Sequence, residues 1–98
     1  MRADLIHSRE SAETLALQCL TWLIGNEDLL PVFMNATGAS AEDLRMGAQD
    51  VDFLGSVLDF IMMDDAWVMA FCGAHQLPFE APMRARQALP GGQAAHWT

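Results

Sequence analysis

The chain has 98 residues, 52% of them apolar, and its 13 acidic and 5 basic side chains give a formal net charge of −8. This length allows a single hydrophobic core, and the apolar fraction excludes disorder over most of the chain. The negative charge repels phosphates and anionic lipid head groups, so we expect neither nucleic acid nor a membrane as a partner.

The first apolar run predicts a helix over residues 9–24, and its polar positions Thr14, Gln18 and Thr21 recur on one side of that helix. These polar residues interrupt the run, whereas a membrane span needs roughly 20 apolar residues. The run also lacks the pattern of a secretory signal peptide. We therefore expect a cytoplasmic protein.

Short polar segments mark where further helices begin and end. Asn26 and Asp64 each precede an apolar run, and their side chains can accept hydrogen bonds from the free N–H groups of a new first turn. Gly38 and Pro78 follow the next two apolar runs and end them. These signals predict six helices and no strand, with helices near residues 9–24, 27–36, 41–48, 51–63, 65–75 and 82–89.

The predicted helix over residues 51–63 is apolar on most of its circumference. Its polar residues Asp52, Ser56 and Asp59 fall at i, i+4 and i+7 and therefore form one narrow stripe. A surface helix needs an apolar face over only about a third of its circumference. We therefore expect this helix at the centre of the protein, with Phe60 in the core and the other helices around it.

The pattern of the first helix recurs later in the chain at a constant offset of 38 positions. The equivalent positions are Thr14 and Asp52, Gln18 and Ser56, Thr21 and Asp59, Trp22 and Phe60, Asn26 and Asp64, Phe33 and Phe71, and Gly38 and Gln76. Two copies of a three-helix unit would explain the match, and residues 14–37 should then superpose on residues 52–75. Chance is the alternative, because any two amphipathic helical hairpins share such features.

The expected architecture is all-α, a compact bundle of about six short helices that forms a single domain over residues 8–89. Residues 1–7 carry no strong helix start signal, and residues 90–98 lack hydrophobic periodicity. We expect both ends to be mobile.

Several segments together resemble a known protein family. They are the leucine-rich first helix, the turn Thr37-Gly38, the pair Leu44-Arg45, the run DFLGSVLDFIMMDD, Pro78 and the pair Ala85-Arg86. The most specific part is Asp52-Phe53-Leu54 followed by Leu58-Asp59-Phe60. Over residues 10–89 the chain is similar to a family of short, mostly alphaproteobacterial proteins known only as a domain of unknown function (family 3572). The resemblance implies a compact soluble fold, and it brings no activity, cofactor or catalytic residue.

Cys72 and His75 are the residues closest to a metal-site motif. Their i, i+3 spacing on one helix supplies half of a zinc site, but two more ligands are missing from the local sequence. We favour a buried thiol and a histidine stabilised at a helix C-terminus. Cys19 and Cys72 have no framework spacing, so we expect free thiols rather than a disulfide. No metal, cofactor or catalytic residue is assigned.

Asp59 is unusual because it is a carboxylate in the middle of an apolar helix. It either meets water along the polar stripe or pairs with an arginine such as Arg45 or Arg86. We favour the solvated position, since fully buried carboxylates are uncommon.

The leading functional prediction is a small acidic protein–protein interaction module without catalytic activity. The chain has more bulky apolar side chains than so small a bundle can easily bury, so some of them should form an exposed patch. The candidate patch consists of Trp22, Leu30, Met62, Met63 and Trp67. Its partner would be another protein or a second copy of the chain in a homodimer.

Methionine is frequent enough to suggest a deformable binding surface. Met34, Met62, Met63 and Met69 lie in or beside the predicted hairpin helices, where they could form an adaptable groove or simply fill gaps in the core. A metal- or carboxylate-dependent enzyme is the alternative function. It would require a cleft that contains His75, Cys72 or Asp59.

Overall fold

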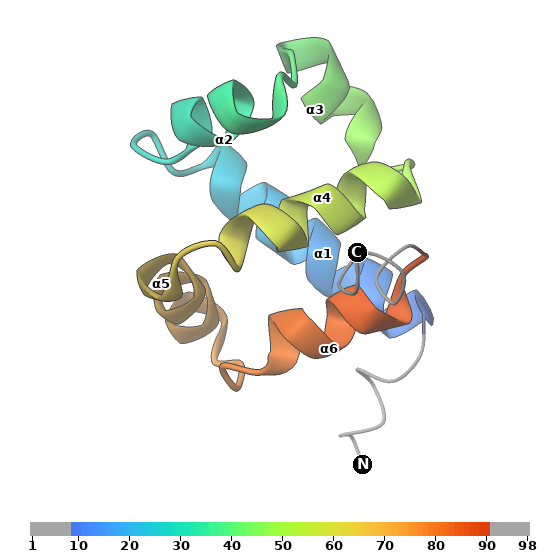
Figure 1. Ribbon diagram of the computed structural model, residues 1–98, viewed down its shortest axis with the longest axis vertical. Helices are drawn as coiled ribbons and strands as arrows, with labels where there is room; N and C mark the ends of the chain where they lie inside the picture. Colours follow the sequence, from blue (N-terminus) through green and yellow to red (C-terminus); the bar gives the residue numbers. More distant parts are fainter. Residues whose placement is uncertain (1–8, 91–98) are drawn as a thin grey trace.

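The computed structural model describes residues 9–90, which form six helices and no strand, so the all-α prediction is confirmed (Figure 1). The helices are α1 (Arg9–Ile24), α2 (Leu30–Thr37), α3 (Ala41–Gly47), α4 (Val51–Ile61), α5 (Asp65–His75) and α6 (Ala81–Ala88). The predicted bounds of α1 and α5 agree with the structure. The predicted mobile ends, residues 1–7 and 90–98, lie outside the described residues except for Pro90.

Local hydrogen bonds explain where the helices begin. The Asn26 side chain accepts from the backbone N–H groups of Asp28 and Leu29, both at 3.1 Å. Residues 27–29 form turns, so α2 begins three residues later than predicted. Asp64 accepts from the N–H of Ala66 at 2.9 Å and caps α5 as predicted.

Two helices end on a residue in the left-handed backbone region. Gly38 follows α2 with φ 75°, and Gln76 follows α5 with φ 57°. These two residues occupy equivalent positions, as do the capping residues Asn26 and Asp64. The helix ends at Gly38 and Gln76 therefore recur at the predicted spacing, whereas α2 begins three residues later than this spacing requires. The superposition of the two hairpins stays a prediction.

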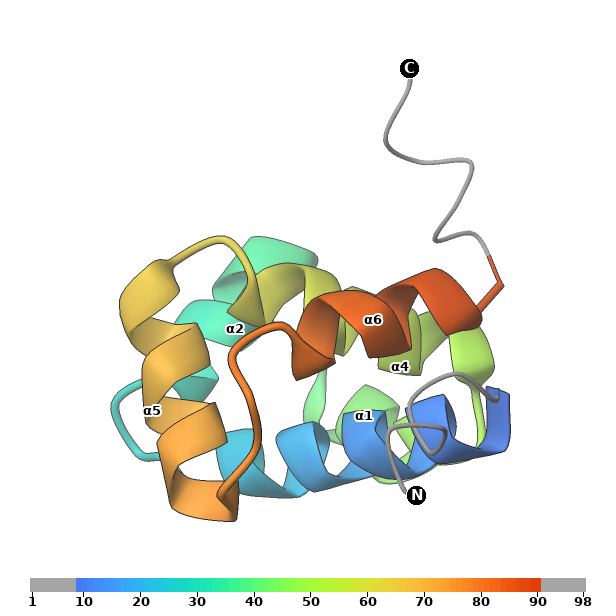
Figure 2. The same cartoon turned by 90° about the horizontal axis from the view of Figure 1, so that it is seen from below.

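α4 lies at the centre of the bundle, as predicted. It contacts α1, α3, α5 and α6, and its Phe60 ring meets the Phe33 ring of α2 with 5.1 Å between centroids. Figure 1 shows α2 and α3 on one side of α4 and α5 and α6 on the other. α6 lies alongside α1, and α5 stands at the end of this pair (Figure 2).

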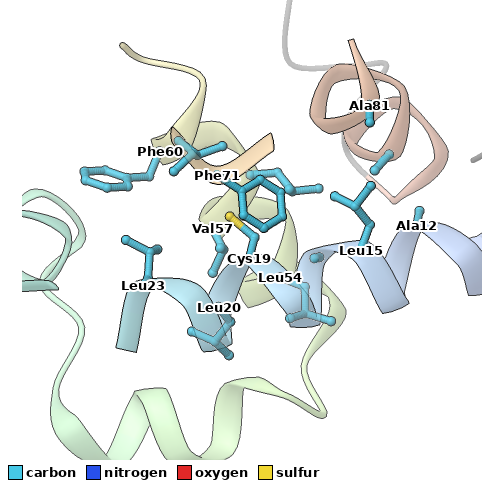
Figure 3. Packing of buried hydrophobic residues seen from close by; sticks show 14 of the residues in the cluster. Ala12, Leu15, Cys19, Leu20, Leu23, Leu54, Val57, Phe60, Phe71 and Ala81 are labelled. Carbon is cyan, nitrogen blue, oxygen red and sulfur yellow. The ribbon is translucent and has the colours of Figure 1, made fainter. Parts of the chain in front are cut away.

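The core is formed mainly by α1 and α4, whose apolar side chains face each other (Figure 3). Leu23, Val57 and Ile61 are fully buried, and Phe60 is 2% exposed. The polar positions Thr14, Gln18 and Thr21 of α1 and Asp52 and Asp59 of α4 lie outside the buried set, and Ser56 is partly buried. The prediction that these positions avoid the core is therefore confirmed.

Candidate docking groove

An open groove of about 520 Å³ lies between the end of α4, α5 and the beginning of α6. Its lining is largely apolar and consists of Met62, Asp65, Val68, Met69, Phe79, Glu80 and Met83. Large apolar side chains are exposed here, with Met69 at 54%, Phe79 at 58% and Met83 at 48%. Single exposed apolar side chains are common on monomers, but several of them grouped in one groove make this surface a candidate docking site.

The helical repeat places the groove residues on one face. Asp65, Val68 and Met69 occupy positions i, i+3 and i+4 of α5, and they therefore line the same side of that helix. Glu80 and Met83 have the i, i+3 relation at the start of α6, where Phe79 immediately precedes them. Both α5 and the start of α6 therefore contribute one face to the lining of the groove.

Hydrogen bonds to Cys72 hold the connection between α5 and α6. The Leu77 N–H donates to the Cys72 carbonyl at 2.9 Å, and the Cys72 thiol donates to the Pro78 carbonyl at 3.5 Å. Ala81 N–H in turn donates to the Pro78 carbonyl at 3.0 Å. These bonds place Phe79 beside the first turn of α6.

The charged groups that line the groove are both carboxylates. Asp65 lies on the α5 wall and Glu80 on the α6 wall, and neither forms an ion pair within the described residues. The arginines Arg9, Arg45 and Arg86 instead pair with Glu13, Glu42 and Asp59, respectively. The groove therefore combines a largely apolar lining with two carboxylates that have no ion-pair partner among the described residues.

The sequence matches the family described as protein of unknown function (DUF3572) over residues 9–92. The chain belongs to this family. The family resemblance found in the sequence is thereby confirmed, and DUF3572 carries no assigned activity that could explain the groove. No curated protein and no solved structure matches the sequence. None of the DUF3572 helices within residues 9–90 is long and apolar enough to cross a membrane.

The predicted patch residues occupy different environments in this DUF3572 chain. Met63 is 71% exposed, whereas Trp22, Leu30 and Trp67 are partly buried against the core. Trp22 packs on Phe71 with 5.7 Å between ring centroids, and Trp67 stacks on Phe60 at 4.7 Å. Met62 is also partly buried, and it lines the groove.

The structure adds Phe79 and Met83 to the candidate surface, and sequence reasoning missed both. Of the four methionines that the sequence proposed for a groove, Met62 and Met69 line it. Phe79 lies between Pro78 and Pro82, outside the predicted helices, so helical periodicity gave no information about its burial. Met83 lies in a short helix whose other side chains are mostly small or polar, so its sequence offered little sign of an apolar surface.

The residues proposed for an enzyme do not line the groove. Cys72 is buried, and His75 is exposed at the end of α5, with its ring 4.9 Å from the centroid of Phe71. No group of three or more His, Cys, Asp or Glu side chains within residues 9–90 could hold a metal ion. Burial raises the pKa of Cys19 to about 12, and Cys72 contributes to the rise, so this thiol is unreactive near neutral pH.

Asp59 is exposed to water, the position that we favoured, and it also forms the ion pair with Arg86 that was the alternative. Arg86 Nε donates to Asp59 Oδ1 at 2.8 Å, and Nη1 donates to the Pro90 carbonyl at 3.2 Å. Asp59 keeps half of its side chain in water, with 54% exposed, whereas the Arg86 side chain is 14% exposed. A Cβ on Gly55 would lie 2.8 Å from Arg86 Nη1, so this glycine makes room for the guanidinium.

Proposed function

We propose that the protein is a non-catalytic interaction module that binds apolar side chains of another protein in the groove between α5 and α6. The observation that carries this proposal is the exposure of Met69, Phe79 and Met83 in one groove, beside a core that buries Phe33 and Phe71 completely. Covering apolar surface is the main favourable term in protein association. Flexible methionines also let such a surface adapt to its partner.

Charge favours a partner other than a second copy of the chain. Each copy carries a net charge of −8, and a symmetric contact through the groove would bring Asp65 and Glu80 close to the same residues of the second copy. Like charges in such an interface oppose association. The same negative charge argues against nucleic acid, and the free thiols Cys19 and Cys72 fit a cytoplasmic location, which we also propose.

A selection from a random peptide library tests the proposed function. Immobilised wild-type protein should enrich peptides that lose at least about tenfold in affinity for the double variant Met69→Gln, Met83→Gln. Glutamine keeps the unbranched shape and helix propensity of methionine, so the fold should persist. Met46→Gln is the matched control, because Met46 is 60% exposed on α3 and does not line this groove.

Two results would refute the groove as a docking site. One is a library that yields no binder to the wild-type protein. The other is a set of enriched peptides that bind the double variant as tightly as the wild type. Circular dichroism of each variant should show the wild-type helix content, which separates loss of binding from loss of folding.

A further inference from the structure

We infer that the groove binds an amphipathic helix whose apolar face is flanked by lysine or arginine. This inference rests on the proposed function and specifies the partner of the same site. Three features of the groove support it: its apolar lining, the absence of any strand in the described part of the chain, and the two carboxylates on its walls.

A helix fits the groove best because it satisfies the hydrogen bonds of its own backbone. Residues 9–90 contain no strand and therefore offer no sheet edge with which an extended peptide could pair. An extended segment pressed against Met69, Phe79 and Met83 would lose hydrogen bonds to water without replacing them. A helix satisfies its own backbone groups and presents apolar side chains at i, i+3, i+4 and i+7 to the groove.

The charges on the groove walls determine what flanks the apolar face. Asp65 lines the groove from α5 and Glu80 from the start of α6, and neither has an arginine partner within residues 9–90. Arg84 follows Met83 in the chain but is exposed and does not line the groove. A bound helix with a cation on each side of its apolar face would place one positive charge near each carboxylate.

A second copy of the chain fits this groove poorly. Within the described residues, α5 carries Asp65 and His75, and α1 carries Glu10 and Glu13 against the single cation Arg9. α6 carries Arg84 and Arg86, but its Ala81, Pro82 and Ala85 are buried in the core and its Arg86 pairs with Asp59. No described helix is therefore free to present an apolar face with an unpaired cation on each flank. The occupant should come from a different protein.

Three synthetic peptides of about 16 residues test the inference, with leucines at the four anchor positions and lysine, glutamine or glutamate on both flanks. Fluorescence anisotropy at about 50 mM salt should show the lysine peptide binding at least about tenfold more tightly than the glutamate peptide. The double variant Asp65→Asn, Glu80→Gln should reduce this ratio to about twofold or less. Salt at about 0.5 M should reduce it for the wild type as well.

Each other outcome counts against the inference in a distinct way. Equal binding of the three peptides would show that apolar contact alone selects the occupant, and the docking function would survive. If none of the three peptides bound, while peptides selected from the library bound and required Met69 and Met83, the groove would still be a docking site. Its occupant would then not be a basic helix. A doubled mass of the free protein in light scattering, abolished by Met69→Gln, Met83→Gln, would identify the occupant as a second copy.

Discussion

The two halves of the chain, compared at the 38-residue spacing of the sequence, differ at the positions that form the groove. In the second half, Glu80 and Met83 stand three residues apart at the start of α6, and Glu80 has no ion-pair partner among the described residues. The equivalent positions of the first half are Glu42 and Arg45 on α3, and these two side chains form an ion pair. One half neutralises its carboxylate, whereas the other leaves it beside an exposed methionine.

The same comparison holds for the aromatic residue at the groove. Phe79 is 58% exposed, and its equivalent in the first half is Ala41, which has no large apolar side chain. The first half thus carries an ion pair and an alanine at positions where the second half carries an exposed methionine and an exposed phenylalanine beside a carboxylate without an ion-pair partner among the described residues. The difference teaches that the groove does not follow from the 38-residue spacing alone, and it supports the proposed docking role.

The interior of the two halves is more alike than the surface. Trp22 of α1 contacts Phe71 of α5 with 5.7 Å between ring centroids, and Phe60 of α4 contacts Phe33 of α2 at 5.1 Å. Trp22 and Phe60 occupy equivalent positions, and so do Phe33 and Phe71. Each half therefore packs an aromatic of its first helix against the second helix of the other half.

The largest expected effect tests this interior correspondence. Phe60 is 2% exposed and also stacks on Trp67, so Phe60→Ala should lower the free energy of unfolding by about 3–5 kcal/mol. Trp22 is only partly buried, so Trp22→Ala should cost less, about 1–3 kcal/mol. Urea melts measure both. Equal losses would mean that the two aromatic side chains contribute equally to the free energy of unfolding despite their different burial.

The next effect concerns how the last helix of the second half is held. Arg86 binds Asp59 and the Pro90 carbonyl, whereas the equivalent position of the first half is Ala48. Arg86→Ala should lower stability by about 1–3 kcal/mol, because charged hydrogen bonds and packed methylene groups are lost. Arg84→Ala on the same helix is the control and should change stability by less than about 0.5 kcal/mol. Similar urea midpoints for both variants would show that the ion pair does not contribute to stability.

Met83→Arg introduces at the groove the residue type that the first half has at the equivalent position, Arg45. The new guanidinium could pair with Glu80 as Arg45 pairs with Glu42, and it would fill part of the apolar lining. Binding of the lysine-flanked peptide should fall at least about tenfold, equivalent to about 1.4 kcal/mol, with stability nearly unchanged. Anisotropy titrations measure the loss, and Met46→Arg on α3 is the control. Unchanged peptide affinity would place the binding surface elsewhere.

The smallest effect tests the two left-handed helix ends. Gln76→Gly should raise the free energy of unfolding by about 0.5–1 kcal/mol, because glycine adopts a positive φ without steric cost. Gly38→Ala should lower it by about 1 kcal/mol, since alanine is strained at φ 75°. Opposite shifts in thermal midpoint are expected. Shifts of the same sign would show that the two ends are not equivalent.

Features set by neighbouring residues could be predicted from the sequence. The turn that Asn26 holds before α2, the Asp64 cap of α5 and the helix end at Gly38 all depend on contacts within a few residues. The Asp59–Arg86 pair could be named only as one option, because its partners are 27 residues apart. Gly55 offered an unused signal, since a glycine inside an apolar helix often marks a close approach.

The groove could be predicted only in part for a related reason. Met62 and Met69 were recognised as candidates from their residue type, but periodicity does not tell which apolar side chains remain uncovered. Phe79 and Met83 became visible as groove residues only when the turn after Gln76 placed α6 beside α5. Exposure of this kind depends on how whole helices pack.

The most direct test of the central claim is a nitrogen-15 NMR titration of the protein with the lysine-flanked peptide. The account predicts that amide shift changes concentrate at the groove residues Met62, Val68, Met69, Phe79 and Met83. The equivalent positions of the first half, Ile24, Leu30, Pro31, Ala41 and Arg45, should show no comparable cluster among those that carry an amide proton. Shifts centred on α2 and α3, or spread equally over both halves, would contradict the assignment of the groove as the binding site.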